Sequence, residues 1–132
     1  MADGRFEFVV EGPPVPLRAA RKNAKRYREW KGQVHAAALA RWPVGDRPTR
    51  SNRVAVRITN YFTLSPPDID NIIKPILDAL NGLVYEDDRQ VSRVTSVKHD
   101  LSESVSDPAP LVAEGLALCS ELIHVRIEWQ GD

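Results

Sequence analysis

Arg53–Phe62 has the sequence RVAVRITNYF, in which apolar and polar residues alternate. Successive side chains of a β-strand point to opposite faces, so this alternation predicts a strand with one face in the core. Arg5–Glu11 and Leu122–Trp129 show the same period and are rich in β-branched and aromatic residues. Val91–Val97 alternates with Ser and Thr. The sequence therefore predicts four strands.

A long helix is expected between the first two strands. Residues from about Lys22 to Arg41 favour helix, and Pro43 marks the end. Apolar residues recur at three- and four-residue spacing and would form one buried face, whereas the other face is basic. The apolar set is Tyr27, Trp30, Val34, Ala37 and Ala38.

A second helix is expected between the second and third strands. Its apolar stripe is Ile72, Ile73, Ile76, Leu77 and Leu80. Asn81 and Gly82 close the pattern. Pro75 fits this helix only if the regular structure begins near it, where a missing N–H has little effect.

The last part of the chain contains a loop and then a short helix. Ser102–Pro110 has a loop composition, and Leu111–Cys119 can form a helix before the final strand. The predicted order is β-α-β-α-β-(α)-β. A chain of 132 residues favours one domain, 1–132, in which helices pack on the four-stranded sheet. The fold class is α/β of the α+β type.

Composition excludes several classes of protein. One cysteine, Cys119, rules out an intrachain disulfide and a thiolate metal cluster, and fits a reducing compartment. The first residues lack the apolar run of a signal peptide, and no stretch has the length of a membrane span. We therefore expect a cytoplasmic location and no membrane partner.

The zero net charge conceals an asymmetry. Residues 1–63 contain 13 Lys and Arg against 5 Asp and Glu, whereas residues 64–132 contain 5 against 13. A basic half can bind a polyanion, and an acidic cluster can hold a cation. The alternative is that folding mixes the two halves and cancels their fields.

Acidic residues concentrate in two segments, Asp68–Asn71 and Glu86–Asp88. In an extended segment Asp68 and Asp70 would point to the same side, and such a pair needs a cation or a shared proton. Oxygen ligands without His or Cys suit Mg²⁺ or Mn²⁺. On a helix, Lys74 lies one turn from Asp70 and can neutralise charge on a bound phosphoryl group.

Simpler interpretations of these acidic residues remain open. Asp68 or Asp70 could cap the following helix, with a contribution of about 1 kcal/mol. Asp70, Lys74 and Asp78 could form a solvated i,i+4 ladder worth a few tenths of a kcal/mol per pair. Glu86–Asp88 could be an ordinary turn.

Two longer motifs carry a family resemblance. DIDNIIKPILDAL spans Asp68–Leu80, and EDDRQV spans Glu86–Val91. Together they resemble the signature of the RusA-like Holliday junction resolvases, which is D-x-D-N-x-x-K-x-x-x-D-A-L followed by D-D-x-Q-V. The Pro-Pro pair after the first strand and the basic stretch behind it also resemble the family, although more weakly.

The resemblance implies a homodimeric, Mg²⁺-dependent endonuclease with a mixed α/β fold that resolves four-way DNA junctions by paired symmetric nicks, in recombination and repair. By position, Asp68, Asp70 and Asp88 match the catalytic, metal-binding aspartates, and Lys74 matches the catalytic lysine. Asp87 is an alternative to Asp88, which the following Gln and Val favour. Asp78 matches a recurrent acid, for which a structural role is the better interpretation.

A basic segment is the candidate DNA-contacting element. Its candidate DNA-contacting residues are Arg18, Arg21, Lys22, Lys25 and Arg26. Phosphate contacts suit them, and the alternative is a solvated helix face. Residues 102–120 are a longer connection than the family leads us to expect. Other functions left open are a catalytically inactive DNA-binding protein of the same fold and a Mg²⁺-dependent nucleotide hydrolase.

Overall fold

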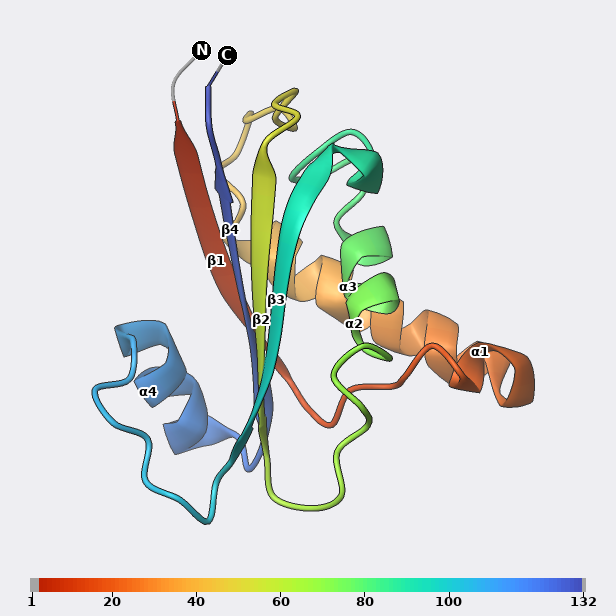
Figure 1. Ribbon diagram of the computed structural model, residues 1–132, viewed down its shortest axis with the longest axis vertical. Coiled ribbons are helices and arrows are strands. Elements are labelled where there is room, and N and C mark those ends of the chain that lie inside the picture. The colour runs from red at the N-terminus through yellow and green to blue at the C-terminus, as the bar shows by residue number, and fades with distance from the viewer. Residues whose placement is uncertain (1–2, 132) are drawn as a thin grey trace.

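Four strands form one mixed sheet in the computed structural model, which describes residues 3–131 (Figure 1). They are β1 (Gly4–Glu11), β2 (Val54–Phe62), β3 (Val91–Asp100) and β4 (Leu122–Trp129). Their order across the sheet is β1-β4-β2-β3. β4 is antiparallel to β1 and β2, whereas β2 and β3 are parallel. The predicted α+β fold class and the four strands are confirmed.

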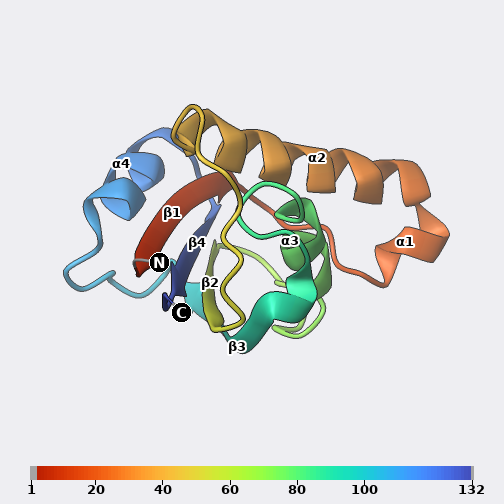
Figure 2. The same ribbon diagram turned by 90° about the horizontal axis from the view of Figure 1, so that it is seen from above.

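The helices cover the two faces of the sheet unequally. The described α-helices are α1 (Ala19–Lys22), α2 (Ala24–Arg41), α3 (Ile73–Ala79) and α4 (Pro110–Leu118), and a 3₁₀ helix, η1, spans Asp88–Gln90. α2 and α3 lie on one face, and α4 lies on the other, against β1 and β4 (Figure 2). α1 and the start of α2 project beyond the sheet.

The main core lies between the sheet and the α2–α3 layer. The alternation of the strands sends one set of side chains into this core: Phe6, Phe8, Val10, Val54, Val56, Ile58, Ile123, Val125 and Ile127. The predicted apolar face of α2 packs onto them, with Tyr27, Trp30, Val34 and Ala38 buried. Burial of each large apolar side chain contributes about 1.5–3 kcal/mol, so this layer fixes where α3 lies.

The long helix differs from its prediction at its start. Instead of one helix from about Lys22, the chain forms α1, breaks at Asn23 and then forms α2. Asn23 has φ −145° and ψ 74°, and its side chain accepts a hydrogen bond from the Arg26 N–H at 3.1 Å. Asn competes for backbone N–H groups in this way, which explains the break. The end at Arg41 agrees with the prediction.

α3 follows the expectation for its proline. Pro75 is the third residue of the helix, where its missing N–H leaves no intrahelical bond unmade. After the helix, Gly82 adopts φ +79°, a left-handed conformation that glycine accepts without strain. β3 runs three residues beyond its predicted end because it pairs with the whole of β2. Within residues 3–131, no helix is both long and apolar enough to cross a lipid bilayer.

Candidate active site

Lys74 joins the two acidic motifs in space. Its Nζ lies 2.8 Å from Oδ1 of Asp78, one turn along α3, and 3.1 Å from Oδ2 of Asp88 in η1. The hydrogen bond to Asp78 raises the pKa of Lys74 most, and the hydrogen bond to Asp88 raises it further. The ammonium group is therefore charged at neutral pH, and it holds a carboxylate from each motif beside it.

A buried glutamine positions the second acidic segment. Gln90 is 6% exposed, and its Nε2 donates to the carbonyl oxygens of Thr49 at 2.8 Å and Ser51 at 2.9 Å. Its Oε1 accepts from the backbone N–H groups of Glu86 at 2.9 Å and Asp87 at 3.0 Å. These four bonds use every hydrogen-bonding atom of the amide and fix the backbone that enters η1.

Asp87 and Asp88 have different surroundings. The Asp87 side chain caps η1 and accepts from the Arg89 N–H at 2.9 Å, in a capping box with Gln90. Asp88, the first residue of η1, turns instead toward Lys74. The segment is thus a capped 3₁₀ turn in which adjacent carboxylates do separate tasks.

The first acidic segment is a turn, so the expectation of an extended conformation is wrong. The Asn71 N–H donates to the Asp68 carbonyl at 3.0 Å, and the Ile73 N–H donates to the Asp70 carbonyl at 3.4 Å. Asp68 and Asp70 are both exposed. Neither caps α3, which begins after Ile72 with no side-chain cap.

Two hydrogen bonds hold the turn from either side. The Ser96 hydroxyl of β3 donates to the Ile69 carbonyl at 2.8 Å. The Leu17 N–H donates to the Asn71 carbonyl at 2.8 Å. The second bond ties the acidic turn directly to the start of the basic segment.

The basic residues predicted to contact DNA are all exposed. Arg18 precedes α1, Arg21 and Lys22 lie in α1, and Lys25 and Arg26 open α2. One of them is partly engaged, because Lys25 Nζ lies 3.9 Å from Oε1 of Glu29. The segment projects past the sheet, so its cations can approach a large partner (Figure 1).

α2 also reaches the lysine cluster through its buried face. Burial raises the pKa of Tyr27, the charge of Asp78 raises it further, and the charge of Lys74 lowers it. α2 also packs against α3, the helix that carries Lys74 and Asp78. The basic helix is therefore a direct neighbour of the helix that holds the lysine.

The donor chemistry of this region fits a hard divalent cation. Asp68, Asp70 and Asp88 offer only carboxylate oxygens, the ligands that Mg²⁺ and Mn²⁺ prefer. Lys74 contacts one oxygen of Asp88, so the other is not needed for that pair. Among residues 3–131, no three His, Cys, Asp or Glu side chains gather closely enough to hold an ion together. The ligand types fit, but they are not assembled around one point.

An α+β domain that sets a lysine among carboxylates beside a basic helix has the composition of a nuclease site. The family model described as Endodeoxyribonuclease RusA matches residues 16–105, about two-thirds of the chain. The chain belongs to the RusA endodeoxyribonuclease family. All the candidate residues, from Arg18 to Asp88, lie inside the matched range. No curated protein matches the chain.

Sequence reasoning did not identify the residues that support the site. Gln90 belongs to the second motif, but the motif does not indicate that its side chain is buried and makes four hydrogen bonds. The Tyr85 hydroxyl donates to the Leu77 carbonyl at 2.7 Å and links the end of α3 to the second segment. Ser96 is one of several hydroxyl residues of β3, and no sequence signal distinguishes it.

Proposed function

We propose that this protein is a Mg²⁺-dependent endonuclease that resolves four-way (Holliday) DNA junctions by paired symmetric nicks, in recombination and repair. Membership of the RusA family supports the substrate class. The observation that carries the proposal is the 3.1 Å contact between Lys74 and Asp88, because it joins the two sequence motifs in space.

Asp68, Asp70 and Asp88 would hold the Mg²⁺ ion. When bound, this ion would activate a water molecule and offset negative charge on the scissile phosphate. Asp88 is favoured over Asp87 because the Asp87 side chain is occupied as the cap of η1.

Lys74 would act as a charge stabiliser. Hydrogen bonds to Asp78 and Asp88 raise its pKa and favour the charged ammonium form. A fixed ammonium group can stabilise negative charge that develops on a phosphate oxygen. Asp78 holds the amine at 2.8 Å, which supports a positioning role for this acid.

The basic segment would bind the DNA backbone. Its exposed cations can pair with phosphates, a contact that is independent of sequence and weakens as salt concentration rises. The bond between Leu17 and Asn71 would then place the bound backbone next to Asp68 and Asp70.

The same proposal includes a homodimer. Paired nicks need two sites related by symmetry, and a twofold dimer with one site in each protomer supplies them. Sedimentation of the purified protein would test this part separately, since we expect the mass of two chains.

A panel of four-way, three-way, flap and linear DNA substrates, with and without Mg²⁺, would test the function. We expect Mg²⁺-dependent nicking of the four-way junction above the other substrates. Asp70→Asn should abolish nicking and leave junction binding intact, whereas Asp46→Asn, at an exposed acid of another loop, should cut like wild type.

The exposed basic segment also favours a second candidate, a DNA-binding protein without nuclease activity. It predicts salt-sensitive junction binding that Asp68→Asn leaves unchanged, with no cleavage in Mg²⁺ or Mn²⁺. Nicking by Asp70→Asn at the wild-type rate would instead show that the site assignment is wrong.

A further inference from the structure

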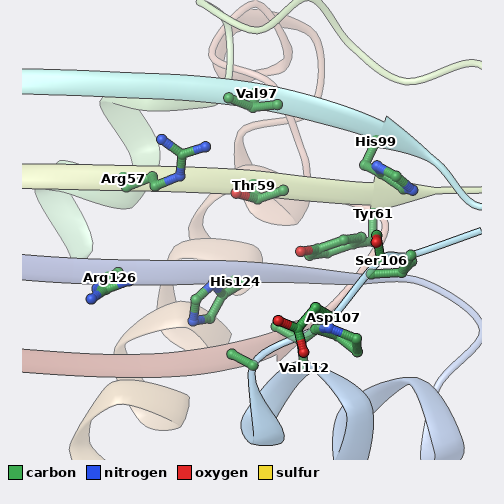
Figure 3. A pocket seen from close by; sticks show the side chains of 13 residues that line it. Arg57, Thr59, Tyr61, Val97, His99, Ser106, Asp107, Val112, His124 and Arg126 are labelled. Carbon is green, nitrogen blue, oxygen red and sulfur yellow. The ribbon is translucent and has the colours of Figure 1, made fainter.

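A second polar site lies on the opposite face of the sheet from α2 and α3. Strands β2, β3 and β4 form its floor, and the segment 105–112, which leads into α4, forms its wall. The cavity between them has a volume of about 270 Å³. Figure 3 shows Arg57 and Arg126 toward one end of it and Ser106 and Asp107 toward the other.

Two arginines lie at one end of the cavity: Arg126 has Glu7 opposite it on β1 and Glu128 beside it, whereas Arg57 has no such acid paired with it among residues 3–131. Arg57 of β2 and Arg126 of β4 are direct cross-strand partners in the antiparallel register. Like charges directly opposite each other destabilise a sheet. Nε of Arg126 lies 2.9 Å from Oε1 of Glu128, although the N–H is not aligned for a hydrogen bond. No carboxylate among residues 3–131 forms an ion pair with Arg57, so an anion bound there would relieve the repulsion.

The middle of the cavity is lined by polar groups that are themselves neutral. His124 is 8% exposed, and its Nε2 lies 3.3 Å from Oε1 of Glu7. Burial lowers the pKa of His124, so its ring is uncharged at neutral pH. The Thr59 side chain lies beside it in register on β2. A ligand here would meet hydrogen-bonding groups, with the Glu7 carboxylate next to the His124 ring.

The far end combines two rings with an unpartnered nitrogen. The Tyr61 and His99 rings are 5.5 Å apart between centroids and tilted by 52°. Nε2 of His99 is buried, and nothing in residues 3–131 hydrogen-bonds to it. This nitrogen has almost no accessible surface, so a ligand in the cavity would meet the two rings rather than the nitrogen.

The wall is held in an unusual conformation at this end. Asp107 has φ +50°, in the left-handed region that non-glycine residues adopt rarely. Asp is one of the residues that adopt this conformation most readily, through local hydrogen bonding of its short side chain. Asp107 lines the cavity with Ser106, which adds an acceptor and a hydroxyl beside the rings.

We propose that this cavity binds a nucleoside monophosphate, with its phosphate at Arg57 and Arg126 and its base beside Tyr61 and His99. Two arginines suit a phosphate, which accepts several charge-assisted hydrogen bonds. Aromatic faces and an acceptor such as Asp107 suit a flat base with amino groups. The cavity, at about 270 Å³, lies near the lower end of the range for small-molecule sites, so it suits one nucleotide rather than a longer ligand.

The site is separate from the cluster around Lys74. Lys74 lies on α3, which covers the other face of the sheet (Figure 2). Most of the cavity wall also follows the range matched by the RusA family model, which ends at residue 105. The proposal therefore does not depend on the proposed junction cleavage.

Titration of the ¹⁵N-labelled protein with 2′-deoxyadenosine 5′-monophosphate, followed by NMR, would test the site. Saturable shifts are expected at the amides of Thr59, Val97 and His124. Arg57→Ala should weaken binding at least about tenfold, because it removes a charge-assisted contact. Arg93→Ala removes an exposed arginine of β3 that does not line the cavity, and should bind like wild type.

Two further ligands would show whether the cavity recognises the base, the phosphate or both. Deoxyadenosine without phosphate and inorganic phosphate alone should each bind more weakly than the nucleotide. The proposal is overturned if phosphate alone binds as tightly, if no saturable shifts occur, or if Arg57→Ala binds unchanged. The ¹H–¹⁵N spectrum of Arg57→Ala should keep the dispersion of the wild-type spectrum, which would show that the variant is folded.

Discussion

Asp68 and Asp70 stand in an exposed turn, whereas Asp88 begins a short helix whose last residue, Gln90, is buried with four hydrogen bonds. The turn is held by two backbone carbonyls, at Ile69 and Asn71. Both segments carry acids of the proposed metal site, but only the second is fixed by a buried side chain.

This difference indicates which half of the site is preformed. A carboxylate on a fixed backbone, with Lys74 beside it, needs little rearrangement when substrate arrives. Carboxylates in an exposed turn can change their side-chain rotamer or backbone conformation at a low cost in free energy. We therefore expect Asp88 and Lys74 to form a rigid anchor toward which Asp68 and Asp70 close.

The largest effect on stability is expected at Gln90. Gln90→Leu replaces the amide by an apolar side chain of similar size, and leaves two N–H groups and two carbonyls without partners. Buried unsatisfied groups cost about 1–3 kcal/mol each and are not additive, so we expect a loss of about 2–4 kcal/mol in the free energy of unfolding. Urea denaturation measures it.

Gln33→Leu is the matched control, since Gln33 is exposed on α2. Its free energy of unfolding should stay within about 0.5 kcal/mol of wild type. If the two variants were equally stable, the second segment would not be held in the way described.

The next effect is expected at Lys74, on catalysis rather than stability. Lys74→Met removes the charge and keeps most of the length, so junction cleavage should fall about 100-fold. The side chain is 53% exposed, and exposed ion pairs contribute little, so stability should change by less than about 1 kcal/mol. Single-turnover cleavage measures the effect on catalysis, and thermal denaturation measures the effect on stability. Cleavage within about threefold of wild type would exclude Lys74 from the reaction.

The smallest effect is expected at Ser96. Ser96→Ala removes the hydrogen bond to the Ile69 carbonyl at an exposed position, which should cost about 0.5 kcal/mol. Junction cleavage should slow by a few-fold. A high Mg²⁺ concentration should reduce this loss, because an ion bound to Asp68 and Asp70 would hold the turn in place. Ser92→Ala, on the same strand and exposed, should change neither quantity. A loss as large as that of Gln90→Leu would mean that the turn is as rigid as the second segment.

The sequence predicted the sheet well, because strand alternation is a local signal. All four strands lie where the period of two placed them, and the buried face of α2 matches its predicted apolar set. The break at Asn23 was missed because a single polar side chain competing for an N–H leaves the helical pattern intact. Strand order, including the parallel β2–β3 pair, depends on contacts that no local pattern records.

The candidate site was predictable in its residues and not in its supports. Residue spacing and the two motifs identified Lys74 and both acidic segments as candidates. In the structure, Lys74 contacts Asp88. The extended conformation expected for Asp68 and Asp70 was wrong, because backbone hydrogen bonds close that segment into a turn. The arginine-lined cavity was not foreseen, since its residues come from three strands and a loop.

The most direct test of the site compares two adjacent aspartates. Asp87→Asn and Asp88→Asn each remove one charge at neighbouring positions, and cleavage of a four-way junction in Mg²⁺ would be measured for both. We predict that Asp88→Asn lowers the rate by at least about 100-fold, whereas Asp87→Asn cuts within a few-fold of wild type, since an Asn can still cap η1. Equal rates for Asp88→Asn and wild type would contradict the proposed role of the Lys74–Asp88 cluster in cutting DNA.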